Sequence, residues 1–188
     1  MDQYLDGVKN QFLYYKILGE KAIDQLEDEQ LFIQHDPQSN SIAVIIKHMA
    51  GNMLSRWTDF LTSDGEKSYR NRDEEFNEQK TDRSIVMKMW NAGWDCLFTS
   101  LNQLQTKDLS TIVFIRNEGH TVVDAINRQL AHYPYHVGQI IFYAKQLKKE
   151  EWNNLSIPRN KSVDYNKEKF SKEKAVKNYT EEEIKKLL

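Results

Sequence analysis

Residues 127 to 140 read N-R-Q-L-A-H-Y-P-Y-H-V-G-Q-I, and His132 and His136 lie four positions apart within them. In an α-helix this spacing puts both imidazoles on one face, one turn apart. Neutral imidazole is the commonest protein ligand for zinc, nickel, copper and iron. The spacing therefore indicates two ligands of a metal site, which needs a third ligand from elsewhere in the chain.

His48 is the natural third ligand, because it lies within the apolar stretch I-A-V-I-I-K-H-M-A. A charged imidazolium among apolar side chains would be costly, whereas a metal ion would keep the ring neutral and satisfy it. The alternative is a set of half-buried histidines that make ordinary hydrogen bonds. By ligand counting, a metal site on His48, His132 and His136 is about as well supported as that alternative.

Four polar residues lie at helical spacing from these histidines and are candidates to orient a substrate or support a ligand: Asn52, Arg56, Arg128 and Gln139. Arginine side chains at these positions could hold an anionic substrate. They could equally lie along the surface or form exposed ion pairs. Gln139 could hydrogen-bond a ligand histidine or simply be a polar contact between helices.

Other residues near the histidines have less specific interpretations. His120, with Glu118 close by, could approach the site as a general base or extra ligand, but an exposed turn is the favoured interpretation. Tyr133 and Tyr135 are expected to be packing residues on other faces. Pro134 predicts a kink between the two histidines, which is either a tolerated bend or a device that aims them.

Apolar residues recur at steps of three and four in four segments, which predicts helices over residues 4–28, 42–61, 82–104 and 121–147. Side-chain oxygens that could serve as N-caps come from residues 39–41 (S-N-S) for the second helix, from Thr81 or Asp82 for the third, and from Thr121 for the fourth. Residues 111–115 (T-I-V-F-I) are β-branched and aromatic, and indicate a short strand or extended arm. With only 7 Gly and 3 Pro, an all-β fold is disfavoured.

The polar segment 62–81 is interpreted as a connector between the second and third helices. It could stretch to about 60 Å, whereas a 21-residue helix spans only about 31 Å. The third helix could therefore run parallel to the second. We expect an all-α four-helix bundle over residues 1–152 and a charged, partly helical C-terminal extension over 153–188 that packs on the bundle. Within that extension, residues 155–158 (L-S-I-P) could fold back over a site, although a solvated tail is favoured.

Composition excludes several functional classes. The net charge of −2 gives no electrostatic case for nucleic-acid binding, and the tail has a net charge of only +3. No apolar run is long enough to span a membrane, and no basic segment followed by an apolar run suggests a signal peptide. The single cysteine, Cys96, excludes an internal disulfide and is compatible with a reducing compartment. We therefore expect a cytoplasmic protein without nucleic-acid or membrane partners.

The sequence resembles the DinB-like (YfiT-like) superfamily of bacterial four-helix bundles, through His48 and the motif H-Y-P-Y-H-V-G-Q-I at 132–140. Residues 51–57 (G-N-M-L-S-R-W) and 152–159 (W-N-N-L-S-I-P-R) resemble a branch of unknown function. The resemblance implies an up-down-down-up bundle and a homodimer. It also implies a divalent metal, zinc or nickel, on His48, His132 and His136, with open positions for water or substrate.

Characterised members of the superfamily include thiol-dependent S-transferases and isomerases that use bacillithiol or mycothiol. The resemblance therefore implies a metal-dependent transferase or hydrolase acting on a small molecule, with a low-molecular-weight thiol as co-substrate. A metal ion with an open position can lower the pKa of a bound thiol or activate water. The alternative is a non-catalytic, metal-stabilised protein that serves as a stress-associated binding or scaffold protein. No motif in the sequence fixes a substrate.

Overall fold

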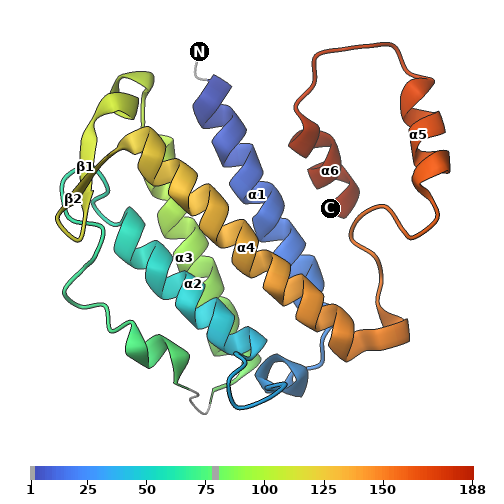
Figure 1. The fold of residues 1–188 in the computed structure, drawn as a ribbon, viewed down its shortest axis with the longest axis horizontal. Helices are drawn as coiled ribbons and strands as arrows, with labels where there is room; N and C mark the ends of the chain where they lie inside the picture. Colours follow the sequence, from blue (N-terminus) through green and yellow to red (C-terminus); the bar gives the residue numbers. More distant parts are fainter. Residues whose placement is uncertain (1–2, 78–80) are drawn as a thin grey trace.

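The computed structural model describes residues 3–77 and 81–188, and most of them are helical (Figure 1). The expected all-α class is confirmed in outline, with one small two-stranded sheet added. The long helices are α1 (Gln3–Ile23), α2 (Ile42–Trp57), α3 (Arg83–Gln103) and α4 (Val122–Lys148). The remaining elements are β1 (Ile112–Ile115), β2 (Glu118–Thr121), α5 (Ser162–Phe170), α6 (Tyr179–Leu187) and four short 3₁₀ helices: η1 (Glu29–Phe32), η2 (Asp73–Phe76), η3 (Thr106–Ser110) and η4 (Lys149–Glu151).

The helices α1 to α4 lie side by side, with α2 packed on α3 and α1 packed on α4 (Figure 1). Their apolar faces meet in one core whose centre is aromatic: Phe12, Trp57, Trp94 and Tyr133. Gly93 permits close contact between α3 and α2, because a Cβ there would lie only 3.0 Å from Cα of Ala50. The helix α4 also contacts α2, and this contact positions the site described below.

Side-chain caps start three of the helices, each at one of the residues predicted for it. The Ser41 hydroxyl accepts a hydrogen bond from the backbone N–H of Val44, at 3.2 Å, and begins α2. Asp82 and Thr121 cap α3 and α4 in the same way. Each cap satisfies a backbone donor that the first helical turn would leave without a partner. The start of each helix fixes which face its later residues occupy.

Two helices end earlier than their apolar periodicity predicts. The prediction ran to residue 28 for the first helix and 61 for the second, whereas α1 ends at Ile23 and α2 at Trp57. Asp59 has a left-handed backbone with φ of 48°, which is incompatible with continued helix. The pattern continued because Leu26 and Phe60, beyond the helix ends, are still buried.

The segment before α4 is a β-hairpin, in which Ile112 pairs with Thr121 and Ile115 with Glu118. The two turn residues, Arg116 and Asn117, both have positive φ, as the favoured two-residue hairpin turn requires. The prediction of one extended segment is therefore incomplete. The sequence E-G-H-T lacks the β-branched run that marked the first strand, so the second strand left no clear signal.

The C-terminal residues form α5 and α6, and α6 lies against α1 (Figure 1). The rings of Tyr14 and Tyr179 meet edge to face with centroids 6.3 Å apart. Residues 155–158 line a cavity of about 410 Å³ together with α5 and α6. These residues therefore face the helices of the same extension, and the idea that they fold back over a functional site stays a prediction.

Within residues 3–77 and 81–188, every helix is either too short or too polar to cross a membrane.

Candidate metal centre

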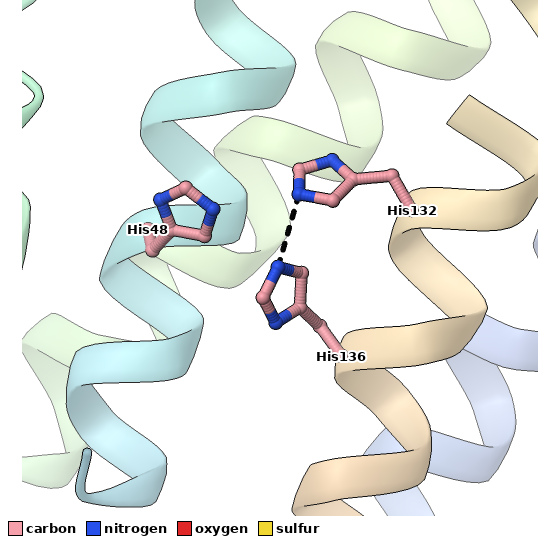
Figure 2. A group of neighbouring side chains, drawn as sticks. All are labelled: His48, His132 and His136. Carbon is pink, nitrogen blue, oxygen red and sulfur yellow. Dashed lines mark hydrogen bonds between the residues drawn. The ribbon is translucent and has the colours of Figure 1, made fainter. Parts of the chain in front are cut away.

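The contact between α2 and α4 brings three histidines together (Figure 2). His48 projects from α2 toward α4, while His132 and His136 project from successive turns of α4. Ligand atoms of the three rings all lie within 4.8 Å of one another. The two Nε2 atoms of His132 and His136 are 2.9 Å apart.

This arrangement fits a divalent metal ion. Zinc binds histidine nitrogen at about 2.0–2.1 Å, so two nitrogens on one ion lie about 3 Å apart. The Nε2 pair already has that separation, and His48 faces it with its ring centroid 4.9 Å from that of His136. The three imidazoles are the ligand type that zinc, nickel and copper share. His48, His132 and His136 could therefore hold such an ion with little rearrangement.

His48 is oriented by a buried carboxylate. Its Nδ1 lies 2.9 Å from Oε2 of Glu75, and both side chains are about 7% exposed. Burial alone would raise the pKa of Glu75, but hydrogen bonds from His48 and Arg70 outweigh it and hold the pKa below 4.5. An ionised carboxylate can only accept a hydrogen bond, so Nδ1 of His48 carries the proton. That leaves its Nε2 free to bind a metal.

Glu75 is itself fixed by an arginine. Nε and Nη2 of Arg70 donate to the two carboxylate oxygens of Glu75 at 2.7 and 2.9 Å. This two-pronged geometry is the strongest common form of arginine–carboxylate pairing. Because Arg70 is almost completely buried, the pair holds the carboxylate in one orientation.

Both Glu75 and Arg70 come from the segment between α2 and α3. Gly51 of α2 makes room for it, because a Cβ there would lie only 2.8 Å from Cδ of Glu75. Phe76 follows, and its ring packs against that of His48 with centroids 4.9 Å apart. The connector therefore does more than span the fold, because η2 supplies part of the site.

His136 is oriented from within its own helix. Its Nδ1 lies 2.8 Å from Oε1 of Gln139, one turn further along α4. The amide oxygen only accepts, so Nδ1 carries the proton and Nε2 is left facing His132. Gln139 also donates to the hydroxyl of Tyr135, at 3.1 Å. The structure thus places Gln139 where a ligand-supporting residue would lie.

The two tyrosines of the motif have different positions. Tyr133 is fully buried, accepts a hydrogen bond from Trp57 Nε1 at 3.1 Å and donates to Asn52 at 2.9 Å. Tyr135 lies on another face as expected, but it is 61% exposed, so the expectation that it is a packing residue is not met. A residue one position before His136 faces outward because His136 itself faces α2.

The two imidazoles on α4 are in the neutral form at pH 7. Burial lowers the pKa of His132 to about 3, with further contributions from His136 and His48. Burial also lowers the pKa of His136, although its bond to Gln139 acts in the opposite direction. Only neutral imidazole can donate a lone pair to a metal, so both rings on α4 are ready to bind without releasing a proton.

A cavity of about 250 Å³ opens beside His48 and His132. Three of the residues singled out in the sequence line it, namely Asn52, Arg56 and Arg128. Arg56 is buried, and it donates to the backbone oxygen of Gly65 and to Glu66. The remaining lining residues had not been singled out: Arg70, Arg72, Arg116 and Gln129.

Two other candidates lie apart from the histidine group. His120 is in strand β2, paired with Val113, and in the described residues it is not one of the three clustered histidines. Glu118 pairs with Ile115 at the hairpin turn. Both residues were expected in an exposed turn, and this is wrong for their secondary structure, because both lie in strand β2. Pro134 does not break α4, which is helical from residue 122 to 148.

Glu75 and Arg70 were missed because they belong to the charged run R-N-R-D-E-E-F, which resembles a solvated loop. Two weak signals pointed to them. Phe76 is an aromatic residue among charges, and Gly51 is a glycine inside a helix, one turn after His48. A glycine in a helix interior is unfavourable, so it often marks a close approach of another segment.

Comparisons with known proteins give one match. Neither the search of curated proteins nor the search of solved structures found a similar protein. A family model described as "Protein of unknown function (DUF1572)" matches residues 1–161, which include all three histidines, Glu75 and the segment 152–159. Because the match covers most of its 188 residues, this chain belongs to the DUF1572 family.

Proposed function

We propose that this protein is a metal-dependent enzyme of the DinB-like superfamily, acting as a thiol S-transferase or a hydrolase. The observation that carries the proposal is the histidine cluster, with its ligand atoms within 4.8 Å of one another. In a metal site, a carboxylate, carbonyl or amide usually holds the histidine nitrogen that faces away from the ion, which aims the other nitrogen at it. Here Glu75 and Gln139 fill that place on two of the three rings.

The finer description of the fold is part of the same proposal. The neighbouring pairs α2–α3 and α1–α4 and the long segment between α2 and α3 are compatible with an up-down-down-up bundle. In such a bundle, functional sites are built from side chains on facing helices. The three histidines are among the residues through which α2 and α4 face each other (Figure 2).

His48, His132 and His136 would hold a divalent metal, with zinc or nickel favoured. Bound there, the ion would act as a Lewis acid that lowers the pKa of a thiol or of water at its open position. Three neutral ligands would leave the ion its full positive charge. The protein's own residues fix the rings: Glu75 and Gln139 hold the Nδ1 protons, so the Nε2 lone pairs stay aimed at one point.

The cavity supports catalysis over a purely structural role. Structural zinc sites are closed by four protein ligands, whereas catalytic sites have three protein ligands and an open position. Within the described residues the cluster has three members, and two of them, His48 and His132, line a cavity of about 250 Å³. A small substrate in that cavity would reach the open side of the site.

The test begins with elemental analysis of protein purified without a histidine tag, which would itself bind metal. The same protein is then assayed for consumption of a low-molecular-weight thiol with electrophilic acceptors, and for hydrolysis of ester and amide substrates. We expect about one ion per chain and turnover that stops on chelation and returns when zinc or nickel is added.

Metal binding without turnover across both assays would favour the alternative, a non-catalytic metal-binding protein. Protein that contains no metal, and takes up none, would overturn the site itself. These two failures are distinguishable, because elemental analysis and turnover are measured on the same samples.

A further inference from the structure

The cavity beside the histidines is lined by five arginines from four parts of the chain. Arg56 comes from α2, Arg70 and Arg72 from the segment after it, Arg116 from the hairpin turn, and Arg128 from α4. The side chains of Arg56 and Arg70 are buried at 7% and 3% exposure, while Arg116 lies at 58%. Buried arginines thus form the inner wall, and exposed ones form the rim.

The carboxylates around the cavity do not balance these charges. One carboxylate, Glu66, is shared by Arg56, Arg70 and Arg116 at 3.2 to 3.5 Å. Glu75 pairs with Arg70, and Asp64 lies close enough to Arg56 for their charges to interact. Among the residues that the structure describes, five guanidinium groups against these three carboxylates leave an excess of two positive charges before any metal is counted.

Part of this arginine lining is available to a ligand. Among residues 3–77 and 81–188, ion pairs engage Arg56, Arg70 and Arg116, which leaves Arg72 and Arg128 without a carboxylate. Arg56 is only 6% exposed, yet its Nε–H has no acceptor within the described part of the chain. A buried donor without a partner is costly, and Arg56 lines the cavity, so an anion that draws this side chain toward it would supply the acceptor.

We propose that this cavity binds a small substrate that carries at least two negative charges on oxyanion groups, such as a phosphate ester or a polycarboxylate. Guanidinium groups bind both chemistries through paired N–H donors. The cavity of about 250 Å³ lies at the small end of ligand pockets, which suits a metabolite rather than a polymer. Because His48 and His132 share the cavity, the anion would place the rest of the substrate at the histidine site.

This inference deepens the proposed function, and the bound anion is a substrate only if the protein is the proposed enzyme. Anion binding itself can be tested separately from metal chemistry. Untagged protein is titrated by calorimetry at low ionic strength with inorganic phosphate, with succinate and with acetate, before and after chelation. We expect phosphate or succinate to bind at least about tenfold more tightly than acetate, with or without metal, because several charge-assisted bonds form. A preference for phosphate would indicate a phosphate ester, and a preference for succinate a polycarboxylate.

The variants Arg72→Gln and Arg128→Gln are each expected to weaken binding of the preferred probe by about tenfold. Arg159→Gln is the matched control, because Arg159 is also exposed but lies outside the cavity lining. Circular dichroism checks that all three variants fold. The proposal is overturned if phosphate and succinate bind no better than acetate. It is equally overturned if the cavity variants behave like Arg159→Gln, since any binding would then involve only a metal or an adventitious surface.

The two proposals fail in different ways. Anion binding that depends on Arg128 in chelated protein, with no turnover under any condition, would retain the anion site and remove the proposed enzyme. Metal-dependent turnover without any preference for dianions would retain the enzyme and remove the anion site.

Discussion

The helices α2 and α4 hold their histidines in place in different ways. On α4, Gln139 bonds to His136 from one turn away, so the support lies within the helix itself. On α2, the support for His48 is Glu75, which is 27 residues away in sequence and is held in turn by Arg70. The hydrogen bond that supports His136 is therefore local in sequence and is made to a neutral group. The one that supports His48 is made to a distant, charged residue.

This difference predicts that the two sides contribute unequally. A buried ionised carboxylate makes a stronger, charge-assisted hydrogen bond than an amide oxygen does. It also makes the opposite ring nitrogen more basic, and so a better metal ligand. In the proposed metal site, the α4 side would supply more ligands, whereas the α2 side should supply the more strongly oriented one.

Removal of a ligand should have the largest effect. His132→Ala is expected to reduce the metal content of untagged protein from about one ion per chain to near zero, because only two ligands remain. Helicity should be retained, since the aromatic core does not depend on this ring. Elemental analysis and far-ultraviolet circular dichroism measure both outcomes. His35→Ala is the control, because His35 is exposed in a loop. Unchanged metal content in His132→Ala would contradict the three-histidine site.

The two supports can be compared directly. Glu75→Gln should weaken metal binding by about 10- to 100-fold, and Gln139→Ala by less than about tenfold. Glu75→Gln should also lower the free energy of unfolding by about 1–3 kcal/mol, because Arg70 loses its buried carboxylate. Competition with a chelator of known affinity gives the metal affinities, and urea unfolding gives the stability. If Gln139→Ala had the larger effect on affinity, the charged support would not be the stronger one.

The same contrast explains what could be predicted from the sequence. His132, His136 and Gln139 are related by helical periodicity alone, and the N-cap residues Ser41 and Thr121 are local signals. His48 could be added because a histidine in an apolar helix face needs a partner.

The other part of the site depends on where the connector lies in three dimensions. Glu75 and Arg116 reach the site from a 3₁₀ helix and from a hairpin turn, and neither element has a periodic pattern. Charged residues in such segments look the same whether they are solvated or buried in pairs. The predicted ends of the first two helices were wrong for a related reason. Leu26 and Phe60 are still buried in the core, although they lie beyond the last helical residues.

Acid should destabilise the two sides in different pH ranges in metal-free protein. Burial holds the pKa of His132 at about 3 and that of His136 below 6.5, whereas both return to about 6.5 on unfolding. The unfolded chain therefore binds more protons below about pH 6.5, so the free energy of unfolding falls as the pH falls through that range. Glu75 has a pKa below its usual 4.5, so its contribution is present above about pH 4.5 and is lost below it.

The measurement is the thermal midpoint of chelated protein between about pH 7.5 and 4, the range in which the two sides separate. We expect a decline that begins near pH 6.5 and becomes steeper below about 4.5. The double variant His132→Asn, His136→Asn should remove much of the first part of the decline and leave the second part. A thermal midpoint that is the same at pH 7 and pH 5 would show that the α4 rings are not kept neutral by burial.

The smallest expected effect tests the close approach of Glu75 to α2. In Gly51→Ala, the new Cβ would collide with the Glu75 carboxylate, which must move away from His48 or turn its oxygens. Gly138→Ala is the matched control, because a Cβ there meets nothing within 4 Å. Both changes replace glycine with alanine inside a helix, so each gains about 1 kcal/mol of intrinsic helix stability.

We expect metal affinity to fall several-fold in Gly51→Ala and to stay unchanged in Gly138→Ala, because only the first change disturbs the orientation of a ligand. Chelator competition on both variants measures the difference. Equal affinities would mean that the connector can shift without turning His48. The hydrogen bond to Glu75 would then need no more exact placement than the one to Gln139. A loss confined to Gly51→Ala would show that a helix glycine, which periodicity treats as a defect, is what allows the connector to reach the site.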